Sequence, residues 1–274
     1  MRSFDLKKRT VIITGASGGF GSELTKLFIK KYGCRVIGIG RSKEKMNALS
    51  LSLGCDKNKF KYFLFDVSDK ENWHKFAAML ESKGVIPDLL INNAGIMPPF
   101  ERFDTEDEET AERVMNVNFM SVVYGCKAML PLLKRSKQGG IVNIASSAAV
   151  SPIVGAAVYS ASKGAVRNFS LSLSEELENS IYVGVVCPGF SKTDLFRDNG
   201  LNEDDFDFIS TLGTDKDEIA EEIAEGVSCG KKLIVCGNDS RLMTAMSSVA
   251  PVRSNALYSK VMKGSDLNIF KDLK

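Results

Sequence analysis

The sequence predicts an α/β protein whose seven-stranded parallel sheet is covered by helices on both faces. Short β-branched, apolar runs alternate with longer segments of helical period along most of the chain, and strands joined through helices in this way lie parallel. Parallel sheets are covered on both faces, so their strands are apolar throughout. With 274 residues, 44% of them apolar and 26% charged, the chain has enough core material for one large domain over residues 1–274.

Seven runs are expected to be strands, and they lie at residues 10–14, 35–40, 61–65, 88–92, 140–145, 182–187 and 232–236. Residues 21–31 are expected to form the first helix, because apolar side chains recur there on one helical face. Residues 110–133 are long enough for several helical turns, and another helix is expected over residues 159–178. The elements thus alternate in the order that a doubly wound sheet requires.

Two segments break this alternation. Residues 190–212 mix aromatic and acidic side chains without a period, which is typical of a flap over a substrate rather than of a core element. Residues 241–274 form a tail whose pattern predicts one or two amphipathic helices interrupted at Pro251. We expect this tail to pack on its own domain or on a second subunit, with contact to a membrane surface as the alternative.

Charge and composition exclude several classes of function. The 36 Lys and Arg residues against 34 Asp and Glu residues leave a net charge of +2, which gives no basic excess for a nucleic-acid backbone. No segment approaches the roughly 18 apolar residues of a membrane span, and residues 1–10 lack the apolar stretch of a secretory signal. One histidine, His74, and scattered cysteines predict no metal site. We therefore expect a cytoplasmic protein.

A glycine-rich turn, TGASGGFG at residues 14–21, joins the first expected strand to the first expected helix. Glycines there let the chain turn tightly and let a pyrophosphate approach the N–H groups of a helix N-terminus. The same segment matches GxSxG through Gly15, Ser17 and Gly19, the pattern of a hydrolase nucleophile elbow. That alternative needs an acid and then a histidine downstream, and His74 lies far from the required position. The turn therefore favours dinucleotide binding.

Gly40-Arg41-Ser42 follows the second expected strand, where the ribose of a dinucleotide is recognised. An NAD enzyme typically has an acid there that accepts from the 2′-hydroxyl, whereas Arg41 can pair with a 2′-phosphate. A solvated loop charge is the alternative for Arg41, and the glycine turn carries no second basic residue. The sequence favours NADP(H) and leaves NAD(H) possible.

Tyr159 and Lys163 stand four residues apart in an expected helix and therefore share one face. A nearby ammonium favours the ionised phenol, so we expect Lys163 to lower the pKa of Tyr159 toward the working range of a general acid. Ser146 ends the preceding strand at the carboxyl edge of the sheet, where its hydroxyl can donate to a substrate carbonyl. Ser147 is the fallback, although strand alternation would point the two side chains to opposite sides.

These features occur in the order typical of the short-chain dehydrogenase/reductase family, which the chain resembles over nearly its whole length. The family motif TGxxxGxG matches Thr14, Gly15, Gly19 and Gly21, its serine matches Ser146, and its YxxxK matches Tyr159 and Lys163. The other matching motifs are the acid after the third strand, Asp66 with Val67; NNAG, which is Asn92, Asn93, Ala94 and Gly95; the asparagine of the long helix, Asn118; and PG followed by Thr, which is Pro188, Gly189 and Thr193.

The resemblance implies a Rossmann-type fold and a proton-coupled hydride transfer. Tyr159 would give or take the hydroxyl proton, Ser146 would orient the carbonyl, and Lys163 would bind the ribose and tune Tyr159. Asn118 would hold a water in a proton relay. The implied cofactor-binding residues are Gly15, Ser17, Gly18, Gly19, Phe20, Gly21, Arg41, Ser42, Asp66, Val67, Asn93, Ala94, Gly95, Tyr159, Lys163, Pro188, Gly189 and Thr193. Gly18 departs from many NADP(H)-preferring members, which carry a basic residue there, so use of both cofactors stays open.

The indication of the substrate class comes from the side chains that we expect around Tyr159. Residues 97–100 and 150–154 are largely apolar, and the flap adds the apolar side chains Phe190, Leu195, Phe196, Phe206 and Phe208. This lining favours a bulky apolar secondary alcohol or ketone, and within the family that the chain resembles it suits a hydroxysteroid dehydrogenase. The resemblance also implies a 3-oxoacyl-thioester reductase as an alternative, although acids outnumber bases in the flap and disfavour an anionic carrier. A nucleotide-binding sensor is the alternative from another class, but the joint presence of all four expected catalytic residues favours an enzyme. The family further suggests a homodimer or homotetramer.

Overall fold

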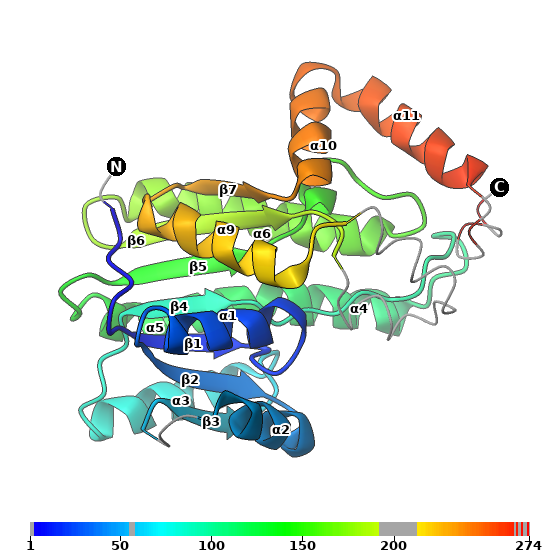
Figure 1. Ribbon diagram of the computed structural model, residues 1–274. Helices are drawn as coiled ribbons and strands as arrows, with labels where there is room; N and C mark the ends of the chain where they lie inside the picture. Colours follow the sequence, from blue (N-terminus) through cyan, green and yellow to red (C-terminus); the bar gives the residue numbers. More distant parts are fainter. Residues whose placement is uncertain are drawn as a thin grey trace.

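Seven parallel strands form one sheet in the order β3-β2-β1-β4-β5-β6-β7 in the computed structural model (Figure 1). The structure describes residues 3–54, 58–191, 213–265, 267, 270 and 273. The strands are β1 (Thr10–Thr14), β2 (Arg35–Gly40), β3 (Phe60–Leu64), β4 (Leu89–Asn92), β5 (Gly140–Ile144), β6 (Tyr182–Pro188) and β7 (Leu233–Cys236). Each predicted strand is confirmed to within one residue at either end, and with it the predicted doubly wound α/β fold.

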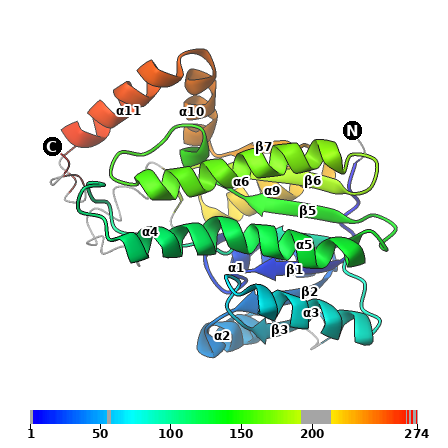
Figure 2. The ribbon, with the colours of Figure 1, turned by 180° about the vertical axis from the view of Figure 1, so that it is seen from behind.

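Helices cover both faces of this sheet. They are α1 (Gly19–Lys30), α2 (Lys43–Leu53), α3 (Lys70–Ser82), α4 (Glu108–Met115), α5 (Ser121–Leu133), α6 (Ala157–Glu176), α9 (Lys216–Ser228), α10 (Asn238–Val249) and α11 (Pro251–Gly264). Figure 1 shows α1 and α9 in front of the sheet, and Figure 2 shows α3, α5 and α6 on the opposite face. In β1, Val11 and Ile13 pack into the core under α1, while Ile12 packs into the core on the other side. This two-sided burial is why the strands read as continuous apolar runs.

The long helix expected over residues 110–133 is interrupted. The segment is helical from Glu108 to Leu133, but a π turn at Asn116–Met120, labelled η1, separates α4 from α5. One extra residue per turn rotates the side chains that follow, and such turns are frequent at functional sites. The turn places Asn118 in the interior, with 1% of its surface exposed.

The predicted tail contains two helices, α10 and α11, divided between Val249 and Pro251. Figures 1 and 2 show that α10 rises from the end of β7 and that α11 runs back toward the end of the molecule where α4 begins. The predicted flap lies outside the described residues except for Phe190 and Ser191 at its start. Among the described helices, none has the length and apolar character that crossing a bilayer requires.

The strand order creates a crevice at the carboxyl edge of the sheet. β1 pairs with β2 on one side and with β4 on the other, so the chain leaves the two neighbours β1 and β4 toward opposite faces. In doubly wound sheets, ligands bind at this topological switch point. Thr14 joins the two strand ends, because its hydroxyl accepts from the N–H groups of Asn93 and Ala94 at 2.9 Å each.

Candidate active site

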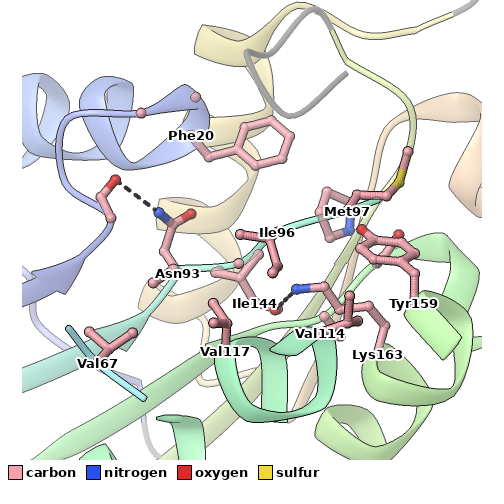
Figure 3. A pocket seen from close by; sticks show the side chains of 18 of the residues that line it. Phe20, Val67, Asn93, Ile96, Met97, Val114, Val117, Ile144, Tyr159 and Lys163 are labelled. Carbon is pink, nitrogen blue, oxygen red and sulfur yellow. Dashed lines mark hydrogen bonds between the residues drawn. The ribbon is translucent and has the colours of Figure 1, made fainter. Parts of the chain in front are cut away.

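A cavity of about 510 Å³ runs along this carboxyl edge, from the glycine turn to Tyr159 (Figure 3). In Figure 3, Phe20 and Val67 lie toward one end, and Met97 and Tyr159 toward the other. Most of the sequence-predicted site residues line it: Gly15, Ser17, Gly18, Gly19, Phe20, Arg41, Ser42, Asp66, Val67, Asn93, Ala94, Gly95, Ser146, Tyr159, Lys163, Pro188 and Gly189. Gly21 and Asn118 do not line the cavity, and Thr193 lies outside the described residues.

Two glycines, Gly15 and Gly21, determine the shape of the turn between β1 and α1. Gly15 has a φ of +63°, in the left-handed region that side chains disfavour. A Cβ on Gly21 would overlap the Gly15 carbonyl oxygen and would lie 2.7 Å from Asn93 Nδ2. Gly21 therefore lets α1 start beside the turn rather than touching a ligand itself. The first turn of α1 holds no acidic side chain, so its N-terminal N–H groups present a positive field to the cavity.

The hydrolase alternative for this turn finds no support in the fold. Ser17 lines the cavity on the side of α1, whereas His74 is exposed on α3, which covers the other face of the sheet (Figures 1 and 2). A nucleophile elbow requires a histidine within hydrogen-bond reach of the serine. Within the described residues, no cluster of three or more His, Cys, Asp or Glu side chains is arranged to hold a metal ion.

Two basic side chains mark the far end of the cavity. Arg41 is exposed and lines the cavity, as predicted, and so does Lys45 in the first turn of α2. The N-cap of that helix is Ser42, whose hydroxyl accepts from Lys45 N–H at 3.1 Å. The sequence interpretation missed Lys45, although its place four residues after Arg41 at a helix start was a usable signal. This end offers two cations and a helix N-terminus, which fit a phosphate group.

Asp66 lies between this basic end and the core. Burial by itself raises the pKa of its carboxyl, but hydrogen bonds from Ser68 Oγ at 2.7 Å and Ser68 N–H at 2.9 Å, with the charge of Arg41, lower the pKa below its ordinary value. The carboxylate is therefore ionised near neutrality and held by its own turn. Beside it, Val67 is buried and its carbonyl accepts from Trp73 Nε1 at 2.9 Å, so the β3 end is a rigid wall of the cavity.

Asn118 supports a loop rather than lining the cavity. Its Oδ1 accepts from Ile96 N–H and its Nδ2 donates to the Ile96 carbonyl, each at 2.8 Å. Nδ2 also donates to Ser162 Oγ at 3.0 Å. The side-chain amide is thus occupied by protein partners, and the role that the resemblance implies, holding a water in a proton relay, stays a prediction. In this structure, the side chain positions the loop that follows Gly95.

Tyr159 and Ser146 present two hydroxyl groups at the inner end of the cavity. Tyr159 is 4% exposed, and burial raises the pKa of its phenol to about 12, against a smaller lowering by a hydrogen bond with the Ser146 side chain. Ser146 Oγ also accepts from Ala148 N–H at 3.1 Å. Ser147 lines the cavity too. Strand alternation does not separate the two serines, because β5 ends at Ile144 and both belong to the short turn after it.

Lys163 reaches the same space from one helical turn further along α6. Its ammonium lies 5.8 Å from the centre of the Tyr159 ring and donates to the Ile144 carbonyl at 3.2 Å (Figure 3). Burial lowers the pKa of Lys163 to about 8. Burial thus dominates both groups in this structure, raising the pKa of Tyr159 and lowering that of Lys163. That Lys163 lowers the pKa of Tyr159 during the reaction stays a prediction.

The wall around the two hydroxyls is apolar. Tyr159 packs in a buried cluster with Met97, Val114, Ala148, Ile153 and Ala156, and Pro98 and Phe190 also line the cavity. Of the residues 150–154 that were expected around the pocket, Ile153 reaches the lining. A site with a long polar end and a small apolar end suits an extended ligand that meets a second, mostly apolar molecule beside the hydroxyl pair.

Comparison with known proteins agrees with this arrangement. Residues 9–204 match the family model of short chain dehydrogenases. The chain is 32% identical over 197 residues to benzil reductase ((S)-benzoin forming) of Saccharomyces cerevisiae, covering 69% of this chain and 74% of that one. It is 31% identical over 223 residues to the NADP-dependent 3-hydroxy acid dehydrogenase YdfG of Escherichia coli, covering 78% and 86%.

A solved structure shares the fold over most of its length. The closed form of serine dehydrogenase complexed with NADP⁺ superposes with a TM-score of 0.76 at 26% identity, covering 84% of this chain and 95% of that one. The family match spans the glycine turn, the Ser146 turn and the Tyr159–Lys163 pair that meet in one cavity here. This chain therefore belongs to the short chain dehydrogenase family.

Proposed function

We propose that this protein is an NADP(H)-dependent oxidoreductase that interconverts a secondary alcohol and a ketone. The observation that carries the proposal is one cavity with cations at its far end, Arg41 and Lys45, and the hydroxyls of Tyr159 and Ser146 at its near end. A dinucleotide phosphate suits the cations and the glycine turn, and a carbonyl suits the hydroxyls.

The residues fit the cofactor at two separate points. At the glycine turn, Gly21 lets α1 start directly beside Gly15, and the N–H groups at this helix N-terminus suit a pyrophosphate. At the other point, Arg41, Lys45 and the start of α2 form a site for a 2′-phosphate. Two relatives with NADP in their names support the same preference, and NAD(H) remains the weaker alternative.

The nicotinamide ring, when bound, supplies or accepts the hydride, and the chain handles the proton. Because burial raises its pKa, Tyr159 carries its proton across the neutral range and can donate it to a carbonyl oxygen as that oxygen gains charge. Ser146 Oγ accepts from Ala148 N–H, which leaves the serine hydrogen to orient the same oxygen. The Lys163 ammonium donates to the Ile144 carbonyl and adds positive charge beside the Tyr159 ring.

We propose a bulky apolar substrate of the hydroxysteroid type. The support is the apolar cluster around Tyr159, which offers Met97, Pro98 and Ile153 to the cavity. The hydroxyls of Tyr159 and Ser146 would fix the carbonyl of such a substrate. The homo-oligomeric state, the cytoplasmic location and the flap over residues 190–212 stay predictions.

The test follows NADPH and NADH oxidation with four carbonyls: benzil, a 3-oxo acid ester, androstenedione and acetoacetyl-coenzyme A. We expect NADPH-dependent reduction that is lost in Tyr159→Phe, with the steroid or benzil preferred. A preference for the thioester would support a 3-oxoacyl-thioester reductase instead. Tight NADPH binding without reduction of any of the four would favour the sensor alternative.

A further inference from the structure

Two residues near the C-terminus are buried. Phe270 is 4% exposed and Leu273 is 3% exposed. The last residues of a domain are ordinarily loose unless specific contacts tie them down. α11 brings the chain back from the protruding α10 toward the end of the molecule where α4 lies (Figures 1 and 2). The burial therefore points to a fixed place for these two side chains near the apolar end of the cavity.

Each of these residues packs on a loop beside that end. The ring of Phe270 meets Phe100 edge-on, with ring centres 5.3 Å apart and an interplanar angle of 70°. Leu273 fills the space above Gly155, which has a φ of +78° and where a Cβ would overlap Leu273 Cδ1. Phe100 follows the lining residues Met97 and Pro98 after β4. Gly155 stands between Ile153, also a lining residue, and α6.

The two loops are joined to each other beneath the tail. Glu101 N–H donates to the Gly155 carbonyl at 2.9 Å, and Ile153 N–H donates to the hydroxyl of Ser160, the neighbour of Tyr159, at 3.0 Å. Met262 of α11 packs against the same apolar cluster as Tyr159. A shift of either loop would thus reach the lining residues and the helix that carries the catalytic phenol.

The start of α10 holds a third loop, the one that follows β6. Phe190 N–H donates to Asp239 Oδ2 at 2.7 Å, and Ser240 Oγ donates to the Cys187 carbonyl at 2.8 Å. The start of α10 thus contacts the loop after β6, while Phe270 and Leu273 contact the loops after β4 and β5. These three loops surround the hydroxyl pair.

We propose that Phe270 and Leu273 are structural parts of the substrate site and act as positioning residues for residues 96–101 and 150–156. The proposal rests on the proposed carbonyl reduction and names the element that sets its substrate fit. Neither residue lines the cavity, and both contact loops at the end opposite Arg41. Their removal therefore changes the binding of the carbonyl substrate while the dinucleotide end is left intact.

The test compares the double variant Phe270→Ala with Leu273→Ala against the control Val261→Ala, which truncates a 62% exposed side chain of α11. With the best carbonyl of the four above, we expect KM to rise about fivefold or more in the double variant, with kcat less affected. The NADPH dissociation constant should stay within about twofold. Phe270→Leu with Leu273→Met should restore most of the affinity, because it refills the same volume.

Amide hydrogen exchange of the NADPH complex supplies a readout that needs no turnover. We expect faster exchange in residues 96–101 and 150–156 of the double variant, and unchanged exchange in residues 11–30. Unchanged exchange in both loops would overturn the proposal, as would a KM equal to that of Val261→Ala. If the wild type reduces none of the four carbonyls, the proposed function fails, while the exchange result still decides whether the tail positions the loops.

Discussion

The side-chain amide of Asn118 bonds both backbone groups of Ile96, accepting from its N–H and donating to its carbonyl at 2.8 Å each. A side-chain amide here replaces the neighbouring strand that these backbone groups would otherwise need. The adjacent Gly95 is close to the same groups, since a Cβ there would lie 3.2 Å from both Asn118 Oδ1 and Lys163 Nζ. The π turn of the long helix thus holds the loop after β4 close to Lys163.

Asn118→Ala should destabilise the fold and reduce turnover. The change leaves the two Ile96 backbone groups without their partner, and an unsatisfied buried group costs about 1–3 kcal/mol. The measurements are the free energy of unfolding in urea and kcat for carbonyl reduction. The matched control is Asn116→Ala in the same turn, where the side chain is exposed; equal effects of the two changes would contradict the positioning role.

Tyr159→Phe should lower kcat by about 10²–10⁴-fold, because the site loses the group that donates the proton. The phenyl ring keeps the buried packing, so the NADPH dissociation constant should change less than about twofold. Steady-state reduction and NADPH fluorescence titration measure the two quantities. Tyr124→Phe on α5 controls for loss of a hydroxyl elsewhere. Retention of full activity would remove Tyr159 from the reaction.

Arg41→Ala and Lys45→Ala should each weaken NADPH binding by about 10–100-fold, because a charge-assisted hydrogen bond contributes about 1.5–3 kcal/mol. NADH lacks the 2′-phosphate, so its affinity should change far less. Titration of both nucleotides against each variant gives the ratio. Lys43→Ala is the matched control, since this residue is in the same helix turn but does not line the cavity. An equal loss for NADH would contradict the phosphate assignment.

Gly21→Ala should abolish nucleotide binding or prevent folding, whereas Gly18→Ala should be tolerated. A Cβ on Gly21 would overlap backbone, the Gly15 carbonyl oxygen, which no rotamer change relieves. A Cβ on Gly18 would meet that oxygen only at 4.0 Å, an ordinary contact. Circular dichroism and NADPH titration compare the two. The prediction is wrong if both variants fold and bind alike.

Lys163 should make stability depend on pH in a specific direction. Its pKa is lowered from 10.5 to about 8 by burial, so between about pH 8 and 10.5 the unfolded chain binds more protons than the native one at this site. Stability from this group therefore rises with pH over that window, by at most about 3 kcal/mol. The raised pKa values of the buried thiols and of Tyr159 act in the opposite direction.

The comparison that isolates Lys163 is the wild type against Lys163→Met. The difference in unfolding free energy, wild type minus variant, should increase in the wild type's favour from pH 7.5 to pH 10, because the other titrating groups are common to both proteins. The corresponding difference in unfolding free energy, Lys163→Arg minus Lys163→Met, should show no such increase, since a guanidinium stays charged over this range. Parallel pH profiles of all three proteins would show that Lys163 is not buried as described.

The sequence by itself determined the sheet and most of the site. Two-sided burial makes the inner strands nearly continuous buried runs, as in β1, β4 and β5, and all seven predicted strands agree with the structure to within one residue at either end. The glycine turn, Ser146 and Tyr159 were found because each is placed by its position relative to a strand end or a helix start, which is local in the sequence. The carboxyl edge of the sheet then brings these local signals together.

The features that depend on burial and on long-range contacts were decided by the tertiary structure alone. The pKa of Tyr159 rises because the folded core removes water from the phenol, an effect that the four-residue spacing to Lys163 does not contain. Asn118 bonds Ile96 across 22 residues of sequence, and Leu273 meets Gly155 through the return of α11. Such contacts depend on how the whole chain packs, and no periodicity or motif within one segment encodes them.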